Sequence, residues 1–255
     1  MPSALHALAD LRAEIAALEG TGKGVGEVMG FGDPRLDGLL PGGGLALKAW
    51  HEFAGEGLEL ETAAASAAFV ARLAQPLCGR GELIWVLRRD DLHAPGLATL
   101  GFPAERLIQV CARDEAEALA VMEDALRTPG VAVVFGEAAD VDLVAGRRLQ
   151  LAAEQGHATG FLLRRRPFGG AARKPLSSAA ATRWTIAPAP SEPAPGEPGL
   201  GAPRWRVRLE RCRGGRTGEW ILESREEDDA PHPFRLVVEL ADRDVAAEEP
   251  VRLAS

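Results

Sequence analysis

The chain has 255 residues, 46% of them hydrophobic, and a formal net charge of -8. This length and composition allow one sizeable core, either as a single domain or as one domain with appendages, and we expect one. There is no early basic-plus-apolar signal segment, and no run approaches the roughly 18 to 20 apolar residues that span a bilayer, so we expect a cytoplasmic protein without a membrane segment. The three cysteines form neither a CxxC pair nor a Cys/His cluster, which argues against a metal site and a disulfide framework.

The first predicted element is an amphipathic helix over residues 3–19, with a plausible cap at Ser3. Its apolar residues recur at three-and-four spacing: Leu5, Leu8, Leu11, Ile15 and Leu18. The glycine-rich stretch that follows contains Gly22-Lys23, but a helix precedes this pair and Gly24 follows it, so it does not predict a phosphate site. We expect residues 1–24 to be a helix and linker outside the main domain.

The next stretch has the arrangement of a phosphate-binding loop. Residues 32–44 have turn chemistry, and they lead into a predicted strand at 45–54 and an alanine-rich helix at about 60–77. A P-loop has the pattern G-x-x-x-x-G-K-[ST], in which backbone N–H groups and a lysine hold phosphates. From Gly55 this chain has G-E-G-L-E-L-E-T, so Leu60 and Glu61 replace the second glycine and the lysine, and only Thr62 is kept.

The replacement of lysine by Glu61 predicts loss of nucleotide binding. A carboxylate about 4 Å from a phosphate charge costs about 4 kcal/mol at an effective dielectric near 20, where a lysine gains a similar amount. This reversal weakens binding by several orders of magnitude. Glu56 and Glu59 add further carboxylates at the helix start, where an anion is favoured. We therefore expect a vestigial loop, with neither ATP binding nor hydrolysis, no catalytic residue and no cofactor.

Apolar runs predict further strands at residues 82–87, 107–111, 131–135 and 160–163, with helices at 114–126 and 142–155. Strands separated by helices indicate a parallel α/β sheet. After the 82–87 strand, Asp90 or Asp91 lies near the place of the carboxylate that orients water in related ATPases, but we interpret Asp91 as a cap for the turn at 92–97. The strand at 131–135 ends in Gly136-Glu137, where an ATPase has a magnesium-holding Asp.

The segment from Phe161 to Trp220 is basic, with twelve Arg or Lys against four Glu, a net charge of +8, so the other 195 residues carry -16. If residues 204–211 form a strand, successive side chains alternate between its two faces, which puts arginines on one face and Trp205, Val207 and Leu209 on the other. Residues 220–222 are expected to pair back on this strand. Either this is a half-buried edge hairpin guarded by arginines, or it contacts DNA or a partner. The candidate contact residues are Arg164, Arg165, Arg166, Arg204, Arg206, Arg208, Arg211 and Arg213.

The C-terminal part is divided by composition. A proline-rich loop is predicted over residues 187–203. From residue 221 the chain has ten acids against four arginines, with one apolar strand or helix at 234–240. The predicted organisation is a helix and linker at 1–24, a main domain at 25–222 and an acidic tail at 223–255.

Several segments, in this order, resemble a known family. The run LDGLLPGGGLALKAWHEFAGEG is similar to the RecA-type core, where an Asp-bearing turn and a Pro-Gly-Gly segment lead into the strand before the nucleotide loop. With RDDLHAPGLATLGFPAERLIQV, RDEAEAL, GRRLQLAAEQG, AAATRW and RWRVRLERCRGG, the chain more closely resembles the ImuA family, RecA-like and SulA-like bacterial proteins of damage-inducible mutagenesis. The resemblance covers residues 30–220.

This resemblance implies an α/β fold with a RecA-like, mainly parallel sheet flanked by helices, plus C-terminal antiparallel strands. It implies a non-catalytic accessory scaffold in error-prone translesion DNA synthesis. The implied partners are an inactive Y-family polymerase-like protein of the ImuB type and, through the complex, an error-prone C-family polymerase, with RecA and DNA as further candidates. Two alternatives remain open: a SulA-like inhibitor of cell division, and a RecA-like ATPase in which Lys48 or Lys23 reaches a phosphate.

Overall fold

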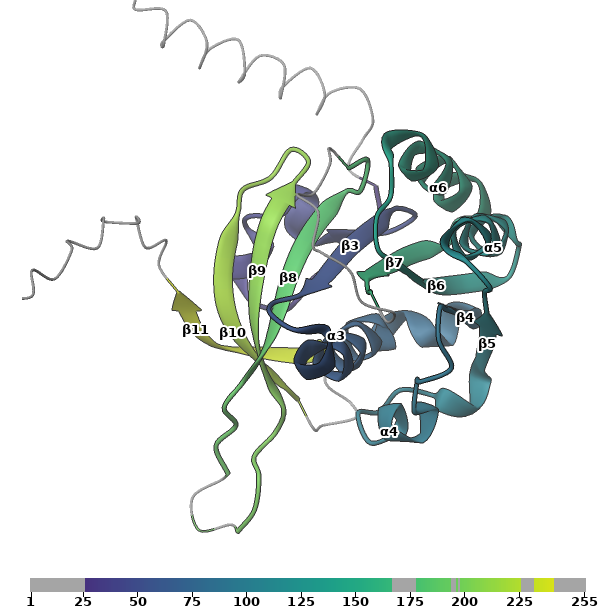
Figure 1. Ribbon diagram of the computed structural model, residues 1–255. Helices are drawn as coiled ribbons and strands as arrows, with labels where there is room; N and C mark the ends of the chain where they lie inside the picture. The colour runs from purple at the N-terminus through teal and green to yellow at the C-terminus, as the bar shows by residue number, and fades with distance from the viewer. Residues whose placement is uncertain (1–25, 167–177, 194–195, 197, 226–231, 241–255) are drawn as a thin grey trace, which may run out of the picture.

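The computed structural model describes residues 26–166, 178–193, 196, 198–225 and 232–240. Within them, one nine-stranded sheet has the order β11-β10-β9-β8-β3-β7-β6-β4-β5, and helices cover both of its faces (Figure 1). Its strands are β3 (Trp50–Gly55), β4 (Glu82–Leu87), β5 (Leu107–Cys111), β6 (Val131–Ala138), β7 (Thr159–Arg164), β8 (Thr182–Ala189), β9 (Arg204–Cys212), β10 (Gly218–Ser224) and β11 (Phe234–Leu240). The helices of four or more residues are α2 (Pro34–Asp37), α3 (Glu59–Ala74), α4 (Ala94–Ala98), α5 (Glu115–Arg127), α6 (Leu143–Gly156) and a 3-10 helix at Gln75–Arg80.

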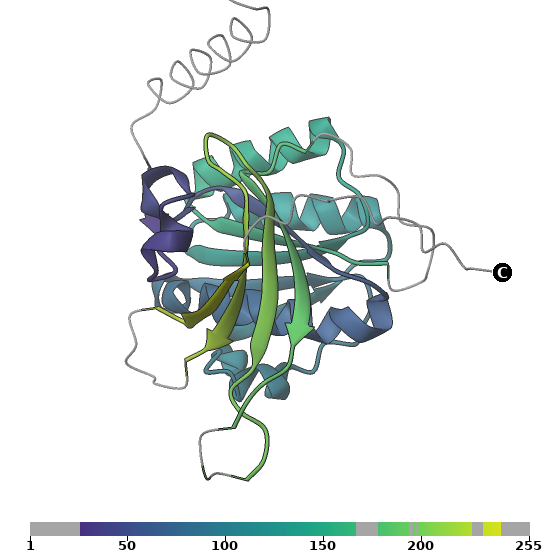
Figure 2. The same ribbon diagram turned by 90° about the vertical axis from the view of Figure 1, so that its left-hand side faces the viewer.

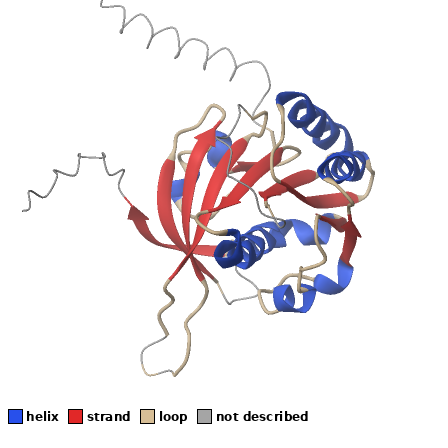
Figure 3. Cartoon of the chain, in the orientation of Figure 1, coloured by secondary structure: helices blue, strands red, loops and turns tan. Residues whose placement is uncertain are grey.

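The sheet has a parallel part and an antiparallel part. The strands from β8 through β3, β7, β6 and β4 to β5 run parallel, whereas β9, β10 and β11 follow as antiparallel neighbours. Figure 3 shows the two parts as one continuous set of strands, and in Figure 2 the green antiparallel strands face the viewer with teal helices behind them. The predicted fold class, a mainly parallel α/β sheet with C-terminal antiparallel strands, is confirmed.

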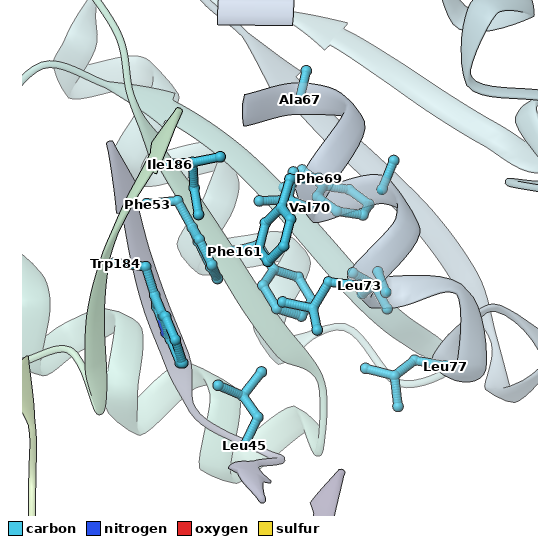
Figure 4. Close-up of a cluster of buried hydrophobic side chains, with 14 of the residues drawn as sticks. Leu45, Phe53, Ala67, Phe69, Val70, Leu73, Leu77, Phe161, Trp184 and Ile186 are labelled. Carbon is cyan, nitrogen blue, oxygen red and sulfur yellow. The ribbon is translucent and has the colours of Figure 1, made fainter. Parts of the chain in front are cut away.

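One face of the sheet packs on α3. Alternate side chains of β3, β7 and β8 point to this helix, and Phe53, Phe161 and Trp184 are fully buried there beside Phe69 of α3 (Figure 4). The antiparallel strands extend the same core, because Trp205 of β9 packs on the Phe69 ring and donates its indole N–H to the Ala65 carbonyl at 3.0 Å. The α3 helix therefore holds the two parts of the sheet together.

The opposite face packs on α5 and α6. Trp50 of β3 points to this side and donates its indole N–H to the carbonyl of Gly146 on α6 at 3.0 Å. Both helices begin at aspartate caps, since Asp114 accepts a bond from the N–H of Glu117 and Asp142 accepts one from the N–H of Ala145. These caps fix where the two helices start relative to the strand ends.

Two predicted elements have different bounds. The strand expected at 45–54 is split into β2 (Leu45–Ala46), which pairs with β1 (Val28–Met29), and β3, because Lys48 between them has φ of 56° and breaks the extended backbone. The helix expected to reach residue 77 ends at Ala74, since Pro76 lies in the following 3-10 turn and cannot donate to the α-helical ladder.

The amino end of the sheet contains a buried neutral histidine. His51 Nε2 lies 2.8 Å from the Ala46 carbonyl, which only accepts, so Nε2 carries the proton and Nδ1 accepts from the Thr182 hydroxyl at 2.7 Å. The Thr182 oxygen in turn accepts the indole N–H of Trp184 at 2.6 Å. Burial lowers the pKa of His51 to about 4. This network ties β2, β3 and β8 together without a charge.

The C-terminal strands differ from the expected edge hairpin. β10 pairs back on β9, as predicted, but β9 also pairs with β8 and β11 pairs with the far side of β10, so neither strand of the hairpin lies at the sheet edge and the edge-hairpin interpretation is wrong. Residue 222, the predicted end of the main domain, lies inside β10, and the apolar run at 234–240 is a strand of the same sheet. The helix and linker predicted at 1–24 lie outside the described residues, as does most of the predicted tail.

Candidate functional site

The strand–loop–helix unit of β3 and α3 lies where the sequence predicts a vestigial phosphate loop. Only Glu56, Gly57 and Leu58 connect the two elements. The Glu56 N–H donates to the Ile186 carbonyl of β8 at 2.9 Å, which extends the strand pairing past Gly55. The connection is therefore short, and part of its backbone is already used in the sheet.

Thr62, the one residue in register with the P-loop pattern, is turned into the helix. Its hydroxyl is buried and donates to the Leu58 carbonyl at 3.0 Å. A Cβ added at Gly55 would overlap the Thr62 hydroxyl oxygen, so the strand end and the first helical turn are in direct contact. The side chain that holds magnesium in a P-loop is used here to close the helix start.

An arginine from a neighbouring strand fills the mouth of the loop. Arg165 follows β7, and its side chain is only 10% exposed. Its guanidinium contacts three carboxylates: Glu59 Oε1 at 2.7 Å, Glu137 Oε1 at 2.8 Å and Asp91 Oδ2 at 2.9 Å. We call Arg165, Glu59, Asp91 and Glu137 the Arg165 cluster. The acids come from the start of α3 and from the segments at the carboxyl ends of β4 and β6, which meet at one edge of a parallel sheet.

Burial and pairing oppose each other in this cluster. Burial raises the pKa of Glu137, although the adjacent Arg165 and the N–H of Arg88, which donates at 3.2 Å, favour its ionised form. Burial acts to lower the pKa of Arg165, but the hydrogen bonds and charges of Asp91, Glu137 and Glu59 outweigh this, so its pKa is raised above the usual arginine value. The three carboxylates and one guanidinium carry a formal charge of -2, which repels a phosphate.

The second acid of the loop pairs with the basic strand. Glu56 Oε2 lies 2.5 Å from Arg206 Nη2, and Glu56 Oε1 lies 4.0 Å from Arg208 Nη1. Arg208 also contacts Glu210 at 3.3 Å, and Arg206 lies 3.8 Å from Glu219. The alternation predicted for β9 is correct, because Arg206 and Arg208 are exposed while Trp205, Val207 and Leu209 are buried.

The other candidate arginines also have partners. Arg164 lies between Glu52 at 3.3 Å and Asp140 at 2.6 Å, and the Arg166 backbone N–H donates to Glu59 Oε2 at 3.2 Å. Arg204 contacts Glu223 at 2.6 Å. Arg211 and Arg213 donate to the backbone carbonyls of Ser178 and Ala179. The eight arginines predicted as contacts thus divide into three groups: Arg164, Arg165 and Arg166 at the end of β7, Arg204, Arg206 and Arg208 on the outward face of β9, and Arg211 and Arg213 against the segment before β8.

The interpretation of Asp91 as a cap is wrong. α4 begins at Ala94 with His93 at its cap position, and the Asp91 carboxylate instead forms two bonds with Arg165. The sequence offers six acids at the loop and at the two following strand ends, and their spacing does not say which of them meet: Glu56, Glu59, Glu61, Asp90, Asp91 and Glu137. The missing signal was that Arg165 directly follows a parallel strand next to the one carrying Glu137, so their side chains share the carboxyl edge of the sheet.

The lysines considered for an unusual nucleotide site lie elsewhere. Lys48 precedes β3, at the opposite end of that strand from Gly55, and its ammonium lies 3.7 Å from Glu27. Lys23 lies outside the described residues. Leu60 and Glu61, which replace the P-loop glycine and lysine, lie in the first turn of α3. Among the described residues, no group of three or more His, Cys, Asp or Glu is arranged to hold a metal ion.

A cavity of about 620 Å³ adjoins the Arg165 cluster. It lies between α3 and the segment that carries α4, and Glu59, Asp91 and Arg165 form one side of it. Its other lining residues include four alanines of α3, Ala63, Ala64, Ala67 and Ala68. The volume is within the range of about 300 to 1,000 Å³ found for ligand pockets.

The fold and this site define an α/β protein with a P-loop-type strand–loop–helix unit that lacks the loop lysine and contains a carboxylate–arginine cluster. The protein named ImuA from Caulobacter vibrioides strain NA1000/CB15N is 59% identical to this chain over 228 residues, which cover 87% of this chain and 93% of that protein. ImuA from Caulobacter vibrioides strain ATCC 19089/CB 15 gives the same values. The chain belongs to the ImuA family.

Other comparisons add little. No family model matches the chain. A crystal structure of SulA from Pseudomonas aeruginosa is 24% identical, covers 45% of this chain and 96% of its own, and has a TM-score of 0.39, too low to support any conclusion. No helix in the described part of the chain is long and apolar enough to cross a membrane.

Proposed function

We propose that this protein is a non-catalytic accessory protein of damage-inducible, error-prone translesion synthesis, acting as a scaffold in the cytoplasm rather than as an ATPase. Membership of the ImuA family supports the pathway. The observation that supports a non-catalytic role is the Arg165 cluster, in which Arg165 pairs with Glu59, Asp91 and Glu137 at the mouth of the loop. An incoming phosphate would have to displace these carboxylates and overcome their net negative charge.

Calorimetry with purified protein and Mg-ATP tests this directly. We expect no binding at nucleotide concentrations up to the millimolar range, and binding with micromolar affinity would overturn the proposal. The double variant Leu60→Gly plus Glu61→Lys restores the two P-loop residues. We expect it to gain no nucleotide binding, since the Arg165 cluster and the inward-turned Thr62 hydroxyl remain. A gain in that variant would mean that residue identity alone had removed the activity.

A genetic experiment tests the pathway. Deletion of the gene should abolish damage-induced mutation, and a plasmid copy should restore it. The variant Thr62→Val removes the only side-chain hydroxyl that remains from the P-loop pattern while keeping a similar volume. We expect it to restore mutation frequency as well as the wild type does. If deletion leaves induced mutation unchanged, the proposed pathway is wrong.

We further propose that the outward face of β9 contacts a protein partner, with an inactive polymerase-like protein of the ImuB type as the first candidate and RecA as a second. On this face the exposed Arg206 and Arg208 pair with Glu56, while Arg204, which is mostly covered, pairs with Glu223. A mixed-charge surface favours a protein of complementary charge over the uniform phosphate array of DNA. The error-prone C-family polymerase would then join through the complex.

The triple variant Arg204→Ala, Arg206→Ala and Arg208→Ala tests this surface. We expect weaker binding of the ImuB-type partner in a pull-down of purified proteins, and only slight binding to DNA by wild type and variant alike. A logarithmic salt slope of about -0.9 per neutralised phosphate would indicate DNA as the main ligand and would contradict the proposal. Circular dichroism on the same samples separates a binding defect from unfolding.

A further inference from the structure

We propose that the cavity between α3 and α4 binds a short peptide segment of a partner protein, in which an aliphatic side chain lies next to a single carboxylate. This inference does not depend on the proposed role in mutagenesis, and it concerns a different surface from the outward face of β9. It rests on the shape of the cavity, the apolar chemistry of its walls and the arginines Arg89 and Arg166 on its polar side.

The apolar walls of the cavity come from two elements. Ala63 and Ala67 are one helical turn apart on α3, as are Ala64 and Ala68, so their methyl groups form a shallow floor that no larger side chain fills. Leu97 of α4 and the nearby Leu100 form the facing wall. An alanine floor with a leucine wall leaves room for an aliphatic side chain, whose burial against these apolar walls is favourable.

The polar side of the cavity contains two arginines that the Arg165 cluster does not include. Arg89, Arg165 and Arg166 line it together with the carboxylates of Glu59 and Asp91, and Arg165 is already paired with these two acids and with Glu137. In the described part of the chain, the Arg166 side chain has a 3.6 Å ion pair with Asp140, and its buried Nη2 has no hydrogen-bond partner. Arg89 is exposed, and in the part of the chain that the structure describes its side chain has no ion pair or hydrogen bond.

These two arginines fit one carboxylate better than a nucleotide. A single acidic side chain can pair with Arg89 and with the Arg166 Nη2 group, whereas a triphosphate would bring three or four negative charges beside Glu59 and Asp91. The described lining residues also include no Phe or Trp on which a base could stack. Because an aliphatic side chain and a carboxylate occur together in ordinary peptide segments, a peptide is the ligand class that satisfies both walls.

The test follows alanine methyl signals of the full-length protein by NMR during titration with acetyl-Leu-Asp-Leu amide. We expect the methyls of Ala63 and Ala67 to shift, with a dissociation constant on the order of 1 mM or tighter. Replacing Asp by Asn in the peptide should weaken binding about tenfold, and replacing it by Lys should abolish binding. Arg89→Glu should weaken binding of the Asp peptide by at least about tenfold, whereas the matched surface variant Arg147→Glu on α6 should leave it unchanged.

Several results would overturn the inference. One is that the methyls of α3 stay in place at tenfold higher peptide concentration, and another is that the Lys peptide binds as well as the Asp peptide. A shift of the same methyls by Mg-ATP and not by the peptide would make the cavity a nucleotide site.

The chain also carries Phe168, two residues after Arg166. If Phe168→Ala moves the α3 methyl signals without added peptide, the chain's own segment 167–177 occupies the cavity. Since calorimetry with ATP tests the proposed function separately, the two can fail independently.

Discussion

Two arginines, Arg165 and Arg206, pair with acids at or just before the start of α3, but the two pairs differ in burial. Arg165 is 10% exposed and pairs with Glu59 and with Glu137, whose side chain is fully buried. Arg206 is 46% exposed and pairs with Glu56, which is 38% exposed. The chemistry of the pairs is the same. Because water screens the second pair and not the first, removal of the arginine should strongly destabilise the protein in the first case and hardly affect its stability in the second.

The largest effect is expected for Arg165→Met. This change leaves the buried Glu137 carboxylate without its counter-ion, and the free energy of unfolding should fall by about 3–5 kcal/mol in urea denaturation. Adding Glu137→Gln in the same chain removes the buried charge and should restore at least about 1 kcal/mol. If Arg165→Met lowers the stability no more than Arg206→Met does, burial does not distinguish the two regions.

The second prediction concerns a buried polar group without charge. Burial lowers the pKa of His51 to about 4 in the folded protein, against the ordinary histidine value of 6.5 in the unfolded chain, so between these pH values the unfolded chain binds more protons than the folded one. The stabilising contribution is present above pH 6.5 and is lost as the pH falls towards 4, by about 3 kcal/mol in all. Denaturation of wild type and His51→Gln across this range measures it. Parallel pH profiles for the two proteins would contradict the burial effect.

An intermediate case is Arg204, whose side chain is 12% exposed and pairs with Glu223, which is 8% exposed. Glu223 has a second partner in Arg235, so removal of Arg204 does not leave its carboxylate alone. Pairing with these arginines lowers the pKa of Glu223 against the opposing effect of burial. We expect Arg204→Met to lower the free energy of unfolding by about 1.5–3 kcal/mol, the usual size for a hydrogen bond to a charged group. A loss as large as that of Arg165→Met would show that Arg235 does not substitute.

The smallest effects are expected on the exposed side of β9. Arg206→Met and Arg208→Met should each lower the free energy of unfolding by less than about 1 kcal/mol, because exposed ion pairs contribute little. Urea denaturation in low and high salt provides the measurement, and added salt should remove most of the difference. A larger loss that persists in high salt would mean that these arginines support the fold through packing of their side-chain methylenes.

Sequence patterns were sufficient for the individual strands and helices. The strands at Glu82–Leu87 and Leu107–Cys111 have the predicted bounds, and α5 and α6 start beside the aspartates with which the sequence begins them. Their apolar periodicity is local information. The position of Arg165 was not predicted in the same way, because its partners Glu59 and Asp91 are far away in the chain and meet it only through the strand order of the sheet.

The same limit explains the assignment of β9. Alternation correctly identified its two faces, but whether the β9–β10 hairpin lies at the sheet edge depends on β11, whose pairing with β10 requires a segment that composition alone places in an acidic tail. Glu56 and Glu219, which pair with Arg206, come from the connection before α3 and from β10, and no spacing within β9 indicates them. Faces of a strand are encoded locally, whereas neighbours are encoded by the whole chain.

The central place of β3 has a consequence for how the chain acquires its structure during synthesis. β3 is the first strand of the nine-stranded sheet in the chain, but its two neighbours are β7 and β8, and its first register partners on them, Gly160 and Thr182, come more than one hundred residues later. A ribosome adding about 5–20 residues per second releases β4, β5 and β6 before either neighbour exists. The strands at one edge are therefore able to assemble first, while β3 and the apolar side of α3 wait for the later half of the chain. This is the interval in which the nascent protein most needs protection from aggregation.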